Sequence, residues 1–236
     1  METRLKSVLW NPKLRLAHKA LAFAVFLWLL RAGDFKFWPT LAFLTIAAAL
    51  YLTPLFRTLE TGSAFLILLV ITWLTLKTFG DPFYFSIAAI YFTALFYLIL
   101  GTKDLAFVKR DDWQRILALG LSYPAYLLFF YYLDASMLIK IAALFMAVLI
   151  ITKSVLKHRL ASWLISLLAV EIAWVTLFLP VGFISQASLA SLFYFGMLDI
   201  TYHIRENRLT KKIVMAHVTI LILLIISVFA SSRWGI

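Results

Sequence analysis

The sequence predicts an all-α polytopic integral membrane protein, a single membrane domain of about nine transmembrane helices in a bundle. Two features of the composition predict this class: 64% of the 236 residues are hydrophobic, and only 14% are charged. A soluble domain averages roughly 45–50% apolar and 25% charged residues, and could not bury so much apolar surface. The third observation is that the apolar residues form runs of about 20, the length at which a helix crosses the hydrocarbon of a bilayer.

The apolar runs give the following order of elements. Residues 1–12 mix apolar with basic side chains, which indicates a short interfacial segment before the first span. Asn11-Pro12 supplies an N-cap and a proline for the first helical position, and Pro39 and Pro82 open the second and fourth spans in the same way. The predicted spans are 14–31, 38–56, 63–79, 83–100, 114–132, 136–152, 161–180, 187–204 and 212–231.

The distribution of Lys and Arg predicts the orientation of the chain. Most of the 22 basic residues lie in the N-terminal segment and in every second loop. Because such residues accumulate on the cytoplasmic side, the N-terminus is expected inside, in the plasma membrane of a prokaryote. The basic loops would then meet anionic lipid headgroups at the cytoplasmic face. The exceptions are Arg31, Lys36, Lys77 and Arg233 in outer segments, and Lys140 within a span.

Composition and motifs exclude several classes of function. The chain has no cysteine, which excludes disulfides, thiolate metal sites and a cysteine nucleophile. The net charge of +11 is spread over short loops, so we expect no nucleic-acid partner. The sequence contains no phosphate-binding loop, no GxGxxG and no HExxH motif. We therefore predict no bound cofactor and no metal site.

Two charged residues fall inside predicted spans and form the first candidate site. Glu171 lies about 18 Å from Arg159, at 1.5 Å per helical residue. Lys140, in the preceding antiparallel span, lies at nearly the same depth. An isolated charge at that depth costs at least a few kcal/mol, so the sequence predicts a buried Lys140–Glu171 pair. Such a pair could fix the register of two helices, or could bind protons or substrate.

A second candidate site lies near the predicted cytoplasmic face. Asp199 and His203 are four residues apart on one helix face, and His217 enters the next span at a similar depth. A carboxylate and two imidazoles could relay protons or bind a divalent metal. Polar residues that interact with one another or with lipid headgroups are the simpler interpretation.

Three classes of function remain open from the sequence. A non-catalytic membrane component, such as an accessory or assembly subunit with a membrane-protein partner, is favoured by the short loops and scarce glycines. A small-molecule, lipid or proton-coupled transporter would use Glu171 and Lys140. An intramembrane lipid-processing enzyme would use Asp199, His203 and His217. The sequence favours a non-catalytic role over an enzymatic one, and predicts no substrate.

Overall fold

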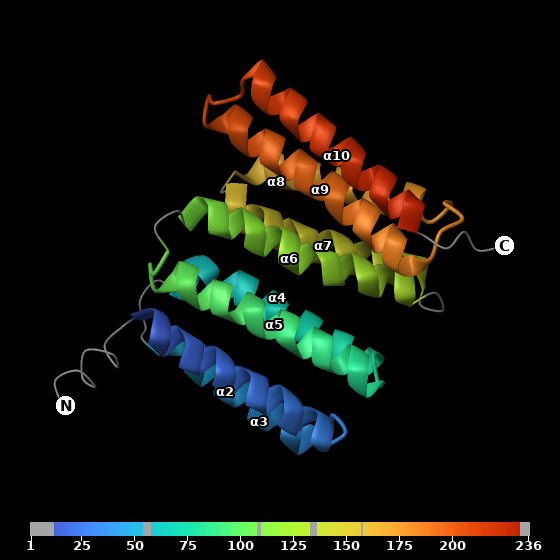
Figure 1. The fold of residues 1–236 in the computed structure, drawn as a ribbon. Helices are drawn as coiled ribbons and strands as arrows, with labels where there is room; N and C mark the ends of the chain where they lie inside the picture. The colour runs from blue at the N-terminus through green and yellow to red at the C-terminus, as the bar shows by residue number, and fades with distance from the viewer. Residues whose placement is uncertain (1–11, 54–57, 108–109, 133–135, 157, 232–236) are drawn as a thin grey trace. The chain divides into compact units, whose positions relative to one another are not determined.

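The computed structural model describes residues 12–53, 58–107, 110–132, 136–156 and 158–231, and within them every regular element is an α-helix (Figure 1). The predicted interfacial segment 1–12 lies outside the described residues except for its last position. The helices are α2 (Pro12–Ala32), α3 (Phe37–Leu52), α4 (Thr58–Thr78), α5 (Pro82–Lys103), α6 (Arg110–Tyr131), α7 (Met137–Leu156), α8 (Arg159–Thr176), α9 (Phe183–Arg205) and α10 (Lys211–Ser231).

Six helical segments in the described residues are long and apolar enough to cross a membrane. They are Thr61–Thr78, Pro82–Lys103, Met137–Leu156, Arg159–Thr176, Phe183–Arg205 and Val214–Ser231. Helix α3 is apolar but has only 16 residues. The membrane class and the helical fold are thus consistent with the sequence prediction, whereas nine crossings and a cytoplasmic N-terminus stay predictions.

Local sequence signals set the ends of several helices. The Asp81 carboxylate accepts hydrogen bonds from the N–H groups of Phe83 and Tyr84, so it caps α5 directly before Pro82. At the other end of α5, Leu105 adopts a left-handed conformation with φ of 56°, and Ala106 N–H donates to the Gly101 carbonyl at 3.0 Å. This pattern is a Schellman motif, which satisfies helix carbonyls and reverses the chain.

The reversed chain after α5 folds back onto the helix. The Phe107 ring lies directly against Gly101, where any side chain would overlap it. Phe107 also contacts Trp113, with ring centroids 4.8 Å apart, and Tyr97, at 5.9 Å. Gly101 is therefore required for close approach, and the aromatic cluster fixes the loop that follows α5.

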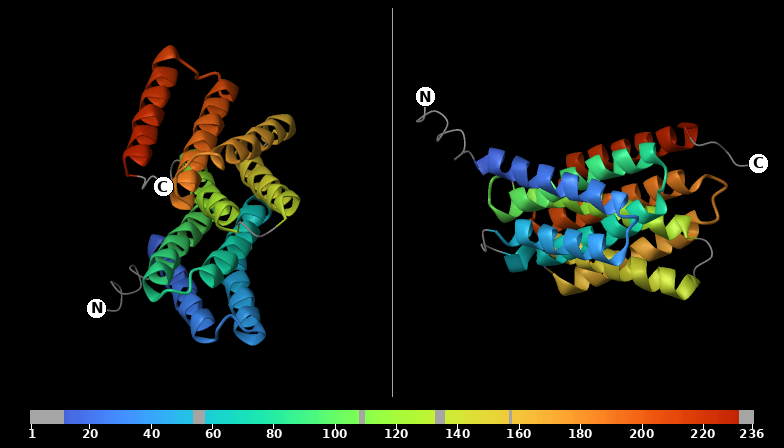
Figure 2. Two further views of the ribbon diagram at one scale, coloured as in Figure 1. Left: turned by 90° about the vertical axis from the view of Figure 1, so that its right-hand side faces the viewer. Right: turned by 90° about the horizontal axis from the view of Figure 1, so that it is seen from below.

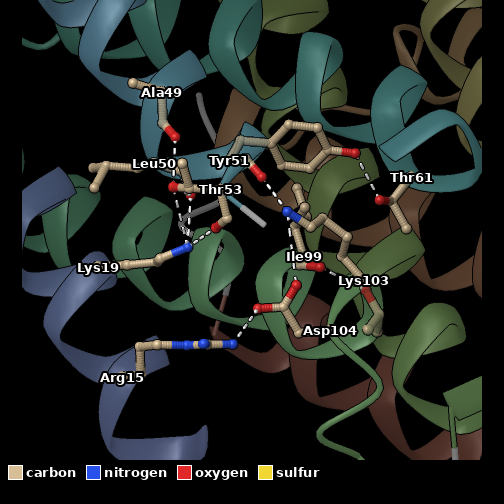
Figure 3. Close-up of polar contacts among 11 residues, drawn as sticks. Arg15, Lys19, Ala49, Leu50, Tyr51, Thr53, Thr61, Ile99, Lys103 and Asp104 are labelled. Carbon is tan, nitrogen blue, oxygen red and sulfur yellow. Dashed lines mark hydrogen bonds and ion pairs between the residues drawn. The ribbon is translucent and has the colours of Figure 1, made fainter. Parts of the chain in front are cut away.

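The chain divides into two compact units, residues 1–117 and 118–236. In the first unit, α2 packs against α3 and α5, and α4 packs against α5. Buried aromatic rings join these helices: Phe23 stacks on Phe96 with centroids 4.3 Å apart, and Tyr51 stacks on Phe65 at 4.2 Å. The antiparallel order brings the end of α3 and the end of α5 close to the start of α2 (Figure 3).

In the second unit, consecutive helices pack side by side: α7 against α8, α8 against α9, and α9 against α10 (Figure 2). The face of α8 that is buried in this unit carries small and hydroxyl side chains, which allow close helix approach. These buried residues are Ser162, Ser166, Ala169, Ala173 and Thr176, together with Ile165.

Candidate functional site

The structure does not bring Lys140 and Glu171 together. The Lys140 side chain is buried, and its Nζ atom lies 5.0 Å from the centre of the Phe129 ring in a cation–π contact. Glu171 is exposed. No ion pair joins the two residues in the part of the chain that the structure describes. Helix length predicts both residues at one level, but it could not give the directions of their side chains.

Glu171 lies in the middle of an exposed apolar stripe along α8. Helical spacing of three and four residues puts its neighbours on the same side of the helix. These exposed neighbours are Leu160, Trp163, Leu164, Leu167, Trp174 and Val175. We call these six residues with Glu171 the α8 stripe. The opposite face is the small-residue face that packs within the unit. Trp163, at one edge of the α8 stripe, contacts Phe145 of α7 with ring centroids 5.2 Å apart.

The Glu171 carboxylate has no hydrogen bond or ion pair with any described residue. It lies about 18 Å along α8 from Arg159 and about 7.5 Å from Thr176, where the helix ends, at 1.5 Å per residue. A carboxylate at this depth is expensive when it faces hydrocarbon, and carboxylates inside spans almost always face protein or water. The described residues of this chain offer the Glu171 side chain no counter-charge and no hydrogen-bond donor.

Asp199 and His203 do interact, as the sequence predicts for residues one helical turn apart. Asp199 is buried, and its Oδ2 atom lies 3.4 Å from His203 Nδ1. His203 Nδ1 is also 2.9 Å from the Asp199 carbonyl oxygen. One helical turn thus holds an acid and an imidazole together near the end of α9.

The third predicted member, His217, has a side chain outside the described part of the structure. The backbone register does place it near the pair. A Cβ atom at Gly196 would lie 3.4 Å from Leu221 Cδ1, and α9 and α10 run antiparallel, so position 217 is level with positions 199–203. Within the described residues, no group of three acidic, histidine or cysteine side chains could hold a metal ion.

A further group of charged side chains, two of them buried, was not predicted from the sequence. It lies where α3 and α5 end and α2 begins, and comprises Arg15, Lys19, Tyr51, Lys103 and Asp104 (Figure 3). We call these residues the helix-end cluster. Lys103 is fully buried, and its Nζ donates to the Tyr51 carbonyl oxygen and lies 4.8 Å from the centre of the Tyr51 ring. The same ammonium is 3.6 Å from Asp104 Oδ1.

Lys19 completes the contacts at the end of α3. Its Nζ donates to the Leu50 carbonyl at 3.1 Å and to the carbonyl of Thr53. The last carbonyls of a helix have no partner within the helix and form the negative end of its dipole. Two lysines from neighbouring helices therefore satisfy carbonyls at the C-terminal end of α3 and join it to α2 and α5.

Asp104 balances part of this positive charge. Its side chain is almost completely buried, and Arg15 NH2 lies 3.7 Å from its Oδ2 atom. Both ion-pair distances exceed hydrogen-bond length, and neither Asp104 oxygen has a hydrogen-bond partner. Arg15 is more than half exposed, so the pair that it makes contributes little. The arrangement supports a structural role, in which charge holds helix ends together.

The sequence contained a weak signal for the helix-end cluster. Lys19 and Lys103 were interpreted only as basic residues that set membrane orientation, and Asp104 was not singled out. The neighbouring pair Lys103-Asp104 directly after an apolar run was the available clue. Only the packing of three helices shows that the lysines point at the end of α3 rather than at lipid headgroups.

No protein-family model, curated protein or solved structure matches this chain. The site is therefore interpreted from its own geometry. The lysines of the helix-end cluster donate to the chain's own backbone, and Asp199 and His203 contact each other. Among the predicted site residues whose side chains the structure describes, only Glu171 is both exposed and surrounded by an apolar face.

Proposed function

We propose that this chain is a non-catalytic component of a membrane-protein assembly, and that the α8 stripe binds a transmembrane helix of a partner protein. The observation that carries this proposal is the exposed Glu171 carboxylate in the middle of an otherwise apolar helix face. In this proposal the chain crosses a prokaryotic plasma membrane nine times with its N-terminus in the cytoplasm. The distribution of Lys and Arg along the sequence supports that orientation.

The Glu171 carboxylate indicates which kind of side chain the partner helix should carry. A charged side chain in a lipid-facing helix costs up to roughly 2.5–3.5 kcal/mol on insertion scales, the value at the helix centre. A basic or hydrogen-bond-donating side chain at the same depth on a partner helix removes this cost and fixes the register of the two helices. Bulky Leu and Trp side chains on both sides of Glu171 supply the apolar contact area for such a helix.

Photo-crosslinking in native membranes tests this proposal. A photoreactive phenylalanine analogue would replace Leu167, which lies one turn from Glu171, and in a control would replace Ile90 on the exposed face of α5. We expect a discrete protein adduct from position 167 and none from position 90. Mass spectrometry of the adduct should identify a transmembrane peptide of the partner that contains a basic or amide residue.

The Glu171 side chain itself is tested with two substitutions in the same crosslinking assay. Glu171→Leu should abolish the adduct, because the polar contact is lost, while the stability of the isolated chain stays equal or rises. Glu171→Gln keeps hydrogen-bonding capacity and should retain part of the adduct.

Three results would overturn the proposal. An adduct with twice the mass of this chain would show a second copy on the α8 stripe. A crosslink within one chain would show that residues 1–117 cover it. Adducts with lipid alone would show that the stripe faces the bilayer.

A further inference from the structure

A buried tyrosine hydroxyl without a partner lies inside the second unit. Tyr126, on α6, is completely buried, and its Oη atom has no hydrogen bond with any described residue. Pro124 interrupts the backbone hydrogen bonding of α6 two residues earlier. A buried hydroxyl without a partner is strongly disfavoured, and almost all such groups in folded proteins have a protein or water partner.

A second buried tyrosine next to Tyr126 has a free acceptor. Tyr194, midway along α9, is also completely buried, and the two ring centroids are 6.4 Å apart with an interplanar angle of 60°. Tyr194 Oη is 3.0 Å from Thr152 Oγ1 on α7, and Thr152 Oγ1 donates its own proton to the Val148 carbonyl at 2.7 Å. Tyr194 must therefore donate to Thr152, which leaves lone pairs on Tyr194 Oη.

The hydroxyl groups thus form a series of hydrogen bonds in which each donates in the same direction. Val148 O accepts from Thr152, and Thr152 accepts from Tyr194. Tyr126 has a proton to donate and no acceptor, while Tyr194 can still accept. Ser122, one helical turn before Tyr126, is buried as well and donates to the Leu119 carbonyl at 2.9 Å, which leaves its oxygen able to accept.

We infer that Tyr126, Tyr194 and Ser122 form an internal binding site for a water molecule within the second unit, in which Thr152 orients the Tyr194 hydroxyl. The water accepts a hydrogen bond from Tyr126 and donates one to Tyr194, and its second proton can be donated to Ser122. A buried water typically makes about three hydrogen bonds to groups that would otherwise be unsatisfied, which is the set that these side chains offer. The site would join α6, α7 and α9 through hydrogen bonds that the apolar core alone does not provide.

Water-edited solid-state NMR of the protein in lipid vesicles tests the site directly. The ten tyrosines are labelled with ¹³C at Cζ, and Tyr126→Phe and Tyr194→Phe assign two of the signals by their disappearance. We expect magnetisation from water to reach Tyr126 Cζ about as fast as it reaches the exposed Tyr84. In Tyr126→Phe, transfer to Tyr194 should become slower. Slow transfer to Tyr126 in the unmodified protein, as in a dry core, would overturn the inference.

Thermal unfolding gives a second test, because a water-bridged Tyr126 hydroxyl and one without a partner predict different changes in Tm when the hydroxyl is removed. If water bridges the hydroxyls, Tyr126→Phe loses hydrogen bonds and lowers the Tm by about 2–4 °C, the shift for a loss near 1 kcal/mol in a chain of this size. If the hydroxyl has no partner, its removal leaves the Tm unchanged or raises it, which would also overturn the inference. Tyr84→Phe, at an exposed position, is the matched control and should leave the Tm unchanged.

Discussion

The helix-end cluster and the α8 stripe differ in how they accommodate charge in an apolar protein. At the end of α3, two ammonium groups donate to backbone carbonyls and Asp104 offsets part of their charge, so the chain itself provides partners for both lysines. On α8, Glu171 stands alone in an apolar face. The comparison indicates that a charged residue near the membrane is evidence for a partner only where the chain offers it no counter-group.

The largest expected effect comes from breaking the helix-end cluster at Lys103. Lys103→Met removes the donor to the Tyr51 carbonyl and leaves Asp104 buried, with the exposed Arg15 and the part-buried Lys19 as the remaining positive charges nearby. We expect a loss of about 3–5 kcal/mol in the free energy of unfolding, the usual cost of breaking a buried pair. Thermal unfolding in detergent, followed by circular dichroism, measures this loss.

Two variants control for the Lys103 substitution. Lys36→Met changes an exposed lysine whose side chain makes no capping bond, and should alter stability by less than about 0.5 kcal/mol. Adding Asp104→Asn to Lys103→Met should recover part of the loss, because no unpaired charge remains. Equal stability of Lys103→Met and Lys36→Met would show that the helix-end cluster does not hold the first unit together.

A smaller effect is expected at the glycine that positions the chain after Asp104. Gly101→Ala places a methyl group within the Phe107 ring, so it should lower stability by about 1–3 kcal/mol. Gly62→Ala, in α4, meets only the Tyr51 hydroxyl at 3.9 Å and should raise stability by up to about 1 kcal/mol. Chemical denaturation of both variants checks the opposite signs, and a gain in both would contradict the packing of Phe107.

The Tyr51 hydroxyl should contribute less to the stability of the first unit than Lys103 or Gly101 does. Its hydroxyl is 2.7 Å from Thr61 Oγ1, whereas its ring stacks on Phe65 and faces Lys103. Tyr51→Phe keeps the ring contacts and removes one buried hydrogen bond, so a loss of about 1 kcal/mol is expected from thermal unfolding. A loss as large as that of Lys103→Met would mean that the hydroxyl, rather than the ammonium, organises the helix-end cluster.

The smallest expected effect tests whether Glu171 has a partner within its own chain. A double-mutant cycle with Lys140→Met and Glu171→Leu should give a coupling energy below about 0.5 kcal/mol, as for residues that share no contact. Unfolding of the four proteins in detergent supplies the cycle. A coupling above 1 kcal/mol would restore the Lys140–Glu171 pair and remove the reason for an external partner.

Whether a candidate site could be predicted from the sequence depends on how far apart its residues lie along the chain. Asp199 and His203 were predicted to lie together because one helical turn fixes their separation. The predicted contact between Lys140 and Glu171 is not seen, because helix length predicts the depth of a residue but not the direction of its side chain. Lys140 contacts the Phe129 ring instead. The helix-end cluster was missed because Lys19, Tyr51 and Lys103 lie on three helices, and nothing local to any one of them signals the others.

Composition and apolar run length were enough to predict an apolar, all-helical chain and the approximate position of each helix. The physical reason is that apolar run length, prolines and caps act within a few residues of the chain. Which charges find a partner could not be predicted in this way, because helix rotation and packing determine whether a lysine meets a helix end or a carboxylate faces outward. At Lys103 packing supplies a partner, and at Glu171 it supplies none among the described residues.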